Sequence, residues 1–179
     1  MKKNILFIFI FIFIFLFQSL CFANETPDVI SGGISLEKII SNAPELIRYC
    51  ALGEKDKVAE LLREGANPNL KFMKLAPAFF AIYKNHPDIL ELLLQYNANP
   101  DEKYMGETLL GFSIYMNNSD CLKVLVDYNA DVNLKSLNKF PIDFALKKKN
   151  NEMAKYLYNN GAKINKKTTK LLKKNGIIF

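Results

Sequence analysis

Histidine, tryptophan and cysteine are scarce in this sequence of 179 residues, which has one His, no Trp and three Cys. Zinc needs several imidazole or thiolate ligands, and thiol redox sites commonly use a CxxC pair. The sequence has no second His and no CxxC, and no residues group as a nucleophile, a base and an orienting side chain. We therefore expect no metal, no cofactor and no catalytic residues, and we predict that the protein is not an enzyme.

A strong charge of one sign is also missing. Lys and Arg number 24 against 18 Asp and Glu, which gives a formal net charge of +6. Without Lys2 and Lys3, which belong to the N-terminal segment described next, the balance is 22 to 18. Such a mild excess does not indicate a nucleic-acid-binding protein, and no motif interleaves basic and aromatic residues on strands. We predict no nucleic-acid partner.

One long apolar run lies near the N-terminus, from Ile5 to Phe17, after a basic start. A basic start, a short apolar core and a small residue such as Ala23 after a more polar stretch are typical of a secretory signal peptide. At ~1.5 Å per residue the run spans about 20 Å as a helix, which is shorter than the ~30 Å hydrocarbon core of a membrane. We predict cleavage after Ala23 and export to the periplasm or the exterior. The alternative is an uncleaved N-terminal anchor.

A 32-residue period runs through much of the remaining chain. Gly or Asn recurs at this spacing, each time followed by Ala and preceded by an apolar pair. The four positions are Gly65, Asn97, Asn129 and Gly161. Gly and Asn tolerate the left-handed conformation that follows a helix end, so each position marks the end of a helix that carries the apolar pair. The sequence therefore predicts four copies of one structural unit.

Each unit contains a second apolar stretch, which lies about sixteen residues before the Gly or Asn. Pro77 and Pro141 stand in these stretches where the first turn of a helix accepts Pro. Each unit is therefore predicted to be a pair of helices. Too few residues remain between pairs for a third helix, and Gly106 and Asn138 indicate turns there. We expect a tight finger between successive pairs.

These units resemble ankyrin repeats from about Glu45 to Asn165. The second helix of the third unit, Leu122-Lys-Val-Leu125-Val126-Asp-Tyr-Asn129-Ala130-Asp131-Val132-Asn133, is close to the V-x-x-L-L-x-x-G-A-D-V-N pattern of that family. The first-helix pattern T-P-L-H-x-A is worn, as in Phe140-Pro-Ile-Asp-Phe-Ala145. The resemblance implies an all-α, ankyrin-type helical solenoid with short β-hairpin-like fingers. The period of 32 rather than 33 residues predicts shortened hairpins.

Three segments follow from this organisation. Residues 1–23 are the predicted signal peptide, and residues 24–34 are a leader that contains Pro27, Gly32 and Gly33 and is expected to be flexible. Residues 35–179 are the predicted ankyrin-repeat domain. Its ends are expected to be covered by a short helix over Ser35 to Ser41 and a capping helix over Thr168 to Lys174, because a terminal repeat cannot bury both faces alone.

We expect the single His and the two Cys of the predicted domain to have structural rather than catalytic or redox roles. His86 stands at the start of a second helix, where ankyrin repeats commonly place His. Cys50 and Cys121 lie in the first and third repeats. Helix-packing steps of ~8–10 Å separate these repeats by more than a disulfide can reach, so we expect two free, buried thiols.

The resemblance directs attention to the concave face, through which ankyrin proteins bind other proteins. Two sets of aligned residues there offer aromatic or apolar area at modest entropic cost. The finger set and the first-helix set together give the predicted partner-binding residues Phe72, Met73, Tyr83, Tyr104, Met105, Tyr115, Met116, Leu137, Lys147 and Lys148. The alternative is that Phe72 and Tyr104 fold back over neighbouring fingers and extend the core.

The C-terminal end is basic, since residues 147–179 hold ten Lys and one Glu. This end could dock an acidic protein or anionic lipid headgroups, or it could simply be solvated surface. We expect a monomer that binds one protein partner, with an accessory or immunity-type role in the cell envelope as one option. The alternatives are weak membrane-surface association through the basic end, and a small-molecule-binding or enzymatic protein. The 32-residue frame shows no insertion that would build a pocket.

Overall fold

The computed structural model describes residues 29–30, 34–35 and 40–177, and the predicted signal peptide lies outside these residues. The chain divides into two compact units, residues 1–43 and residues 44–179. In the first unit, strand β1 (Val29–Ile30) pairs antiparallel with strand β2 (Ile34–Ser35). Ser35, the expected first residue of an N-terminal helix, is thus in a strand. Residues 40–41 are helical and residues 36–39 are not described, so the extent of that helix stays a prediction.

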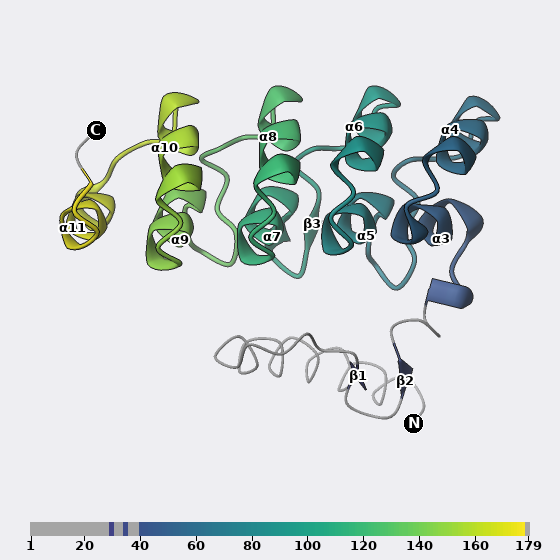
Figure 1. The fold of residues 1–179 in the computed structure, drawn as a ribbon, viewed down its shortest axis with the longest axis horizontal. Coiled ribbons are helices and arrows are strands. Elements are labelled where there is room, and N and C mark those ends of the chain that lie inside the picture. The colour runs from purple at the N-terminus through teal and green to yellow at the C-terminus, as the bar shows by residue number, and fades with distance from the viewer. Residues whose placement is uncertain (1–28, 31–33, 36–39, 178–179) are drawn as a thin grey trace. The chain divides into compact units, whose positions relative to one another are not determined.

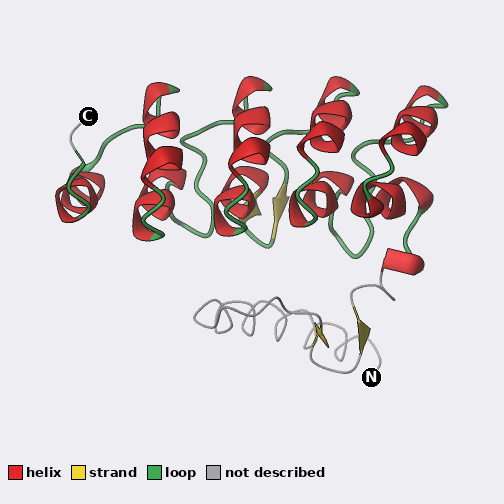
Figure 2. Cartoon of the chain, viewed as in Figure 1, coloured by secondary structure: helices red, strands yellow, loops and turns green. Residues whose placement is uncertain are grey.

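The second unit is a row of helix pairs in chain order (Figures 1 and 2). The four pairs are α3 (Glu45–Leu52) with α4 (Lys55–Arg63), α5 (Pro77–Tyr83) with α6 (Pro87–Gln95), α7 (Leu109–Tyr115) with α8 (Ser119–Asp127), and α9 (Pro141–Lys147) with α10 (Asn151–Asn159). Helix α11 (Lys166–Lys174) follows the fourth pair. The predicted helical solenoid is confirmed. Among the described residues, no helix has the length and apolarity needed to cross a membrane.

Left-handed residues end both helices of every pair. Asn97 and Asn129 have φ of 66° and 64°, and Gly65 and Gly161 have φ of 93° and 92°. The predicted ends of the second helices are therefore confirmed. A second column at the same spacing, which the sequence analysis did not predict, ends the first helices; its members are Gly53, Asn85, Asn117 and Lys149. Lys149 is the only one of these eight helix-end residues that is neither Gly nor Asn, and it adopts φ of 59°.

The buried core residues repeat with the same period of 32 residues. One buried column in the first helices consists of Ile82, Ile114 and Leu146, and another in the second helices consists of Leu93, Leu125 and Leu157. Burial of each of these side chains contributes about 1.5–3 kcal/mol. First helices pack on neighbouring first helices from α3 to α9, and α11 packs on α9. Each pair thus buries its apolar side against the next pair.

Short fingers join the pairs. In the second finger, strand β3 (Lys103–Tyr104) pairs antiparallel with strand β4 (Glu107–Thr108). The other two fingers each have a single bridge, Phe72 with Leu75 and Ser136 with Lys139. In all three fingers two residues separate the paired positions. The fingers are thus short hairpins, their shortening relative to other ankyrin repeats stays a prediction, and the described part of the domain has no sheet core.

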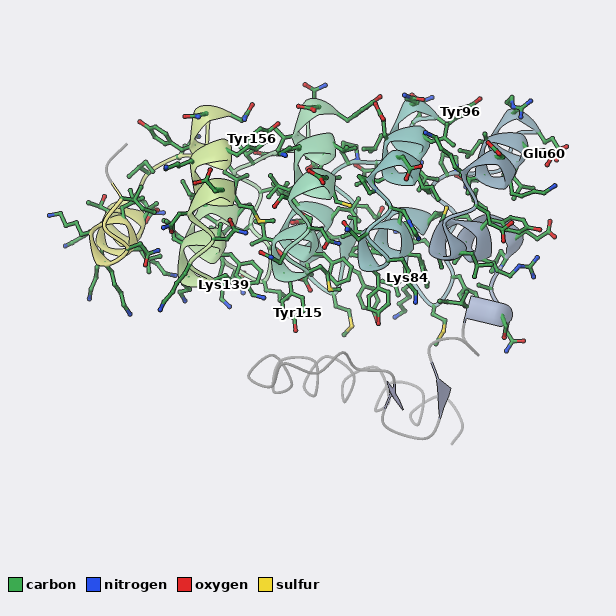
Figure 3. All side chains as sticks on the ribbon, viewed as in Figure 1. Glu60, Lys84, Tyr96, Tyr115, Lys139 and Tyr156 are labelled. Carbon is green, nitrogen blue, oxygen red and sulfur yellow. The ribbon has the colours of Figure 1, made fainter. Side chains whose placement is uncertain are left out.

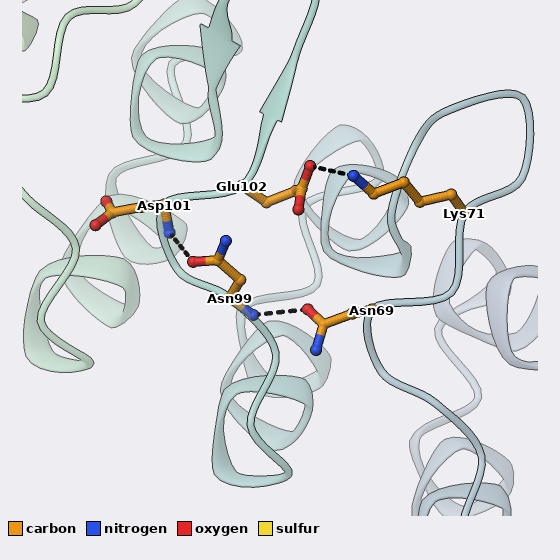
Figure 4. Close-up of polar contacts among 5 residues, drawn as sticks. All are labelled: Asn69, Lys71, Asn99, Asp101 and Glu102. Atoms are coloured by element: carbon orange, nitrogen blue, oxygen red, sulfur yellow. Dashed lines mark hydrogen bonds and ion pairs between the residues drawn. The ribbon is translucent and has the colours of Figure 1, made fainter.

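A ladder of Asn and Asp side chains connects one finger base to the next repeat (Figure 4). The Asn99 backbone N–H donates to Asn69 Oδ1 over 2.8 Å, and Asn69 Nδ2 donates to the Asn97 carbonyl over 3.0 Å. One repeat later, the Asp131 N–H donates to Asp101 Oδ1 over 2.9 Å. In the next repeat Asn133 makes both bonds again, to Gly161 and Lys163. Each rung holds the backbone of the following repeat.

The fourth member of this column, Asn165, ends the ladder. Its Oδ1 accepts from the Lys167 and Thr168 backbone N–H groups, and Thr168 Oγ1 accepts in return from the Asn165 N–H, so the pair forms a capping box for α11. Thr168 Oγ1 also donates to Asp143 Oδ1 of α9 over 2.6 Å, with both residues buried. The predicted capping helix is confirmed and begins two residues earlier than expected.

Candidate protein-binding surface

The tips of the three fingers are left-handed turns. Both residues of each tip have positive φ, which is the pattern of the type I′ turns that suit two-residue hairpins. The tips are Met73 and Lys74, Met105 and Gly106, and Leu137 and Asn138. Asn and Gly favour such positions, whereas Met and Leu have a steric cost there. The predicted binding residues Met73, Met105 and Leu137 thus occupy the first position of each tip.

The apolar tip residues are presented to solvent rather than to the core. Met73 is 40 % exposed and Met105 is 43 % exposed, while Leu137 is half-buried. The second and third tips are joined, because the Leu137 N–H donates to the Gly106 carbonyl over 2.8 Å. The structure therefore brings Met105 and Leu137 together on two connected fingers.

The aromatic finger residues are half-buried. Tyr104 meets Phe79 of α5 edge to face with ring centroids 6.2 Å apart, and burial raises the pKa of its hydroxyl. Tyr104 therefore extends the core in part, which was the alternative interpretation for this column. Phe72 is half-buried on the first finger. The third member of the column, Ser136, is buried, and its Oγ accepts from the Thr108 backbone N–H.

Tyr83 and Tyr115 end the first helices α5 and α7, and Lys147 ends α9. Lys84 Nζ lies 5.7 Å from the centroid of the Tyr83 ring. Lys148 comes from the following repeat to Tyr115, with Nζ 4.6 Å from the ring centroid and 2.8 Å from the Tyr115 carbonyl oxygen. The structure thus brings Tyr115 and Lys148 together.

These residues occupy one side of the domain. Figure 3 shows Lys84, Tyr115 and Lys139 along the side of α5, α7 and α9, and Glu60, Tyr96 and Tyr156 along the side of the second helices. We call the first side, made of the three fingers with α5, α7 and α9, the finger face. Met116 is half-buried after α7, and Lys147 is exposed at the end of α9. Every predicted binding residue lies on the finger face, and the binding role itself stays a prediction.

Glu107 and Lys139 are not among the binding residues predicted from the sequence. They occupy the same register position on neighbouring fingers, 32 residues apart, and Leu75 holds that position on the first finger. Glu107 is largely buried, which raises the pKa of its carboxyl to about 7, while the positive charges of Lys139 and Lys148 oppose this shift. Its Oε1 has no hydrogen-bond partner among the described residues. The signal in the sequence was the pair of opposite charges in one column.

The single His and the two Cys have structural places. The ring of His86 occupies the space that a Cβ on Gly53 would need, so both residues serve the packing of the first two repeats. Cys50 and Cys121 are buried free thiols, as predicted, and burial raises the pKa of each thiol to about 12. Within the described residues, no three His, Cys, Asp or Glu side chains group as metal ligands.

Comparison with protein families matches this chain to the family described as "Ankyrin repeats (3 copies)", over residues 46–136 and again over residues 80–168. A comparison with curated proteins finds no match. The two overlapping matches cover the four helix pairs, the fingers and the start of α11. The chain therefore belongs to the ankyrin-repeat family.

Proposed function

We propose that this chain is an exported, non-enzymatic protein that holds a protein partner on its finger face, as an accessory or immunity-type binder in the cell envelope. Ankyrin repeats generally mediate protein–protein interaction, and proteins built from them are generally binding scaffolds rather than enzymes. Beyond this family property, we propose that the finger face is the binding surface, that the chain is exported, and that it acts in the cell envelope. The expected form is a monomer that binds one partner.

The chemistry of the fingertips carries the proposal. Met73, Met105 and Leu137 occupy left-handed positions that Asn or Gly would fill with less steric cost, and the two Met side chains are exposed. Neither the turn nor the core explains the exposed apolar side chains of Met73 and Met105. Exposed apolar residues on a rigid surface suit contacts with another protein. Local strain that the fold does not need is itself typical of functional positions.

Substitution of all three tip residues by Asn separates binding from folding. The triple variant M73N/M105N/L137N should melt at the same temperature as the wild type or higher, because Asn tolerates positive φ. We expect cross-linking in the native cell envelope to recover a protein with the wild type and not with this variant. Ile164, which is 40 % exposed and lies before α11, provides the control I164N. Recovery of the same protein by the triple variant would contradict the proposal.

The N-terminal sequence supports export. Its basic start, its apolar run and Ala23 fit a signal peptide, and the apolar run is short for a membrane span. The mass of the chain isolated from cells should match residues 24–179, and the chain should be released with the periplasmic or secreted fraction. An intact N-terminus in the membrane fraction would favour the anchored alternative instead.

Helix α11 favours a second candidate function, association with an anionic membrane surface. Five of its nine residues are exposed Lys, namely Lys166, Lys167, Lys170, Lys173 and Lys174. Leu172 and Thr168 are buried, and α11 packs on α9, so its apolar side is already used. Only electrostatic attraction would then hold the chain on lipid, and high salt should release it.

A further inference from the structure

Charge is divided between the two sides of the ankyrin domain. Residues 71–84, 102–116 and 134–149, which comprise the finger face and the residues that directly follow α5, α7 and α9, hold nine Lys and three acidic residues. The second helices α4, α6, α8 and α10 hold five basic and seven acidic residues. The finger face is therefore the basic side of the four repeats, although the domain as a whole is only mildly basic.

The three acidic residues of the finger face neutralise few of these lysines. Glu102 pairs with Lys71 over 2.8 Å, as Figure 4 shows. Asp143 is buried and accepts the hydrogen bond from Thr168. Glu107 is the third, and its largely buried carboxyl forms no ion pair with a described residue.

The two lysines whose charges act on Glu107 make cation–π contacts with aromatic rings rather than ion pairs with carboxylates. Lys139 Nζ lies 5.6 Å from the centroid of the Phe144 ring, and Lys148 Nζ lies 4.6 Å from that of Tyr115. No carboxylate among the described residues forms an ion pair with either lysine. Rings hold an ammonium group in place without cancelling its charge. These two positive charges are thus positioned and still available to an anionic group.

Apolar tips stand on the same two fingers. Met105 and Leu137 belong to the second and third fingers, whose tips are hydrogen-bonded through Gly106. A preorganised pair of fingers loses little conformational entropy on binding. Carboxylates and apolar side chains on one extended segment would meet the lysines and the tips together.

We propose that the second and third fingers dock an acidic segment of a protein partner, with its carboxylates at Lys139 and Lys148 and its apolar side chains at Met105 and Leu137. This inference rests on the proposed function, since it names the chemistry of the partner for the same face. Charge complementarity selects this occupant, because neither lysine forms an ion pair with a carboxylate among the described residues and the second helices on the opposite side are net acidic. Complementary charge also speeds the encounter between the two proteins.

Glu107 gives the interaction a specific pH dependence. The positive charges of Lys139 on the third finger and Lys148 after α9 act on its carboxyl, and burial keeps it largely protonated below about pH 7. When it ionises, it competes with the partner's carboxylates for the same two lysines. Glutamates on a partner are already ionised in this range. Affinity should therefore fall as the pH rises from 6 to 8.

A labelled peptide tests the docking chemistry directly. The probe is fluorescein attached to three copies of Glu-Leu-Glu-Gly, and the matched neutral probe has Gln in place of each Glu. We expect fluorescence anisotropy to show that the acidic probe binds at least about tenfold more tightly, and that K139Q/K148Q removes this preference. The control K123Q/K155Q, on α8 and α10, should retain it. Equal affinity for both probes, or equal loss in both double variants, would overturn the proposal.

The pH arm uses E107Q, which cannot ionise. The wild type should bind the acidic probe several-fold more weakly at pH 8 than at pH 6, and E107Q should bind it equally at both values. The same fall in E107Q would contradict the role of Glu107.

Vesicles of phosphatidylglycerol and phosphatidylcholine test the alternative occupant, an anionic lipid surface. Tighter binding of these vesicles than of the acidic probe, lost in K139Q/K148Q, would replace the protein segment with a lipid surface.

Recovery of the cellular partner separates this inference from the proposed function. If the fingertip variant M73N/M105N/L137N loses the partner and K139Q/K148Q keeps it, the acidic-segment inference fails and the proposed function stands. If both variants keep the partner, both fail. Loss in both variants, with the melting temperatures unchanged, supports both.

Discussion

Replacement of Glu107 by Gln should change how the stability of the protein depends on pH. Glu107 is largely buried on the second finger, and its Oε1 has no hydrogen-bond partner among the described residues. Burial raises the pKa of its carboxyl from 4.5 to about 7. Gln keeps the shape of the side chain but cannot ionise. The substitution therefore removes one titration and leaves the packing nearly unchanged.

The size of the effect follows from that pKa. Below about pH 4.5 the carboxyl is neutral in both the folded and the unfolded chain. Between about pH 4.5 and 7 the unfolded chain releases this proton and the folded chain keeps it, so the free energy of unfolding falls as the pH rises. The loss is complete above the folded-state pKa and amounts to about 3 kcal/mol. The ammonium groups of Lys139 and Lys148 are already included, because they lower this pKa.

Urea unfolding followed by circular dichroism at pH 5 and pH 8 measures this difference. At each pH the free energy of unfolding of E107Q is compared with that of the wild type. Between pH 5 and pH 8 this difference should shift by about 3 kcal/mol in favour of E107Q. Glu152, whose side chain is 89 % exposed on α10, provides the control E152Q, which should follow the wild type. If E107Q and the wild type lose the same free energy between the two pH values, the carboxyl of Glu107 is not held neutral by burial.

Substitutions at three further positions, with a control at Thr169, test other parts of the fold by the same unfolding measurement. Asn129→Gly should be neutral or stabilising, and Asn129→Val should cost ~1–2 kcal/mol at φ of 64°; equal stability of the two variants would disprove the helix-end assignment. Lys149→Gly should stabilise by about 1 kcal/mol, because Lys149 is left-handed; a loss of stability would show that the Lys side chain contributes more than the strain costs. Thr168→Val should cost ~1–3 kcal/mol because it leaves the buried carboxylate of Asp143 without its donor, whereas Thr169→Val should cost little; equal effects would remove the role of this bond.

The helix pairs could be predicted from the sequence because their end signal is local. Gly65, Asn97, Asn129 and Gly161 each end a helix through a backbone conformation that few other residues accept, so the column is visible without any knowledge of packing. The first-helix ends carry the same signal in three of four repeats. Lys149 breaks that column because it adopts positive φ against its own preference. A rule based on residue type therefore misses it.

The surface around Glu107 could not be predicted in the same way. The charge of Glu107 is visible in the sequence, but its burial depends on the hairpin that carries it and on the neighbouring finger. Lys148 reaches Tyr115 across a repeat boundary, which periodicity alone does not indicate. Exposure at the tips depends on turn type, and Met73 and Met105 are not typical type I′ residues. The burial of Glu107 and the position of Lys148 thus depend on contacts between repeats, which the spacing of residues in the sequence does not reveal.

The polarity of the Asn and Asp ladder has a consequence for how the chain assembles as it leaves the ribosome. In every rung the side chain comes from the earlier repeat and the backbone that it holds comes from the later one, as with Asn69 and Asn99, Asp101 and Asp131, and Asn133 and Lys163. Repeats that have already emerged and packed together therefore present positioned side chains to the backbone of the next repeat. Asn165 turns back to cap α11 instead, so at this position the column supplies a helix cap rather than another rung.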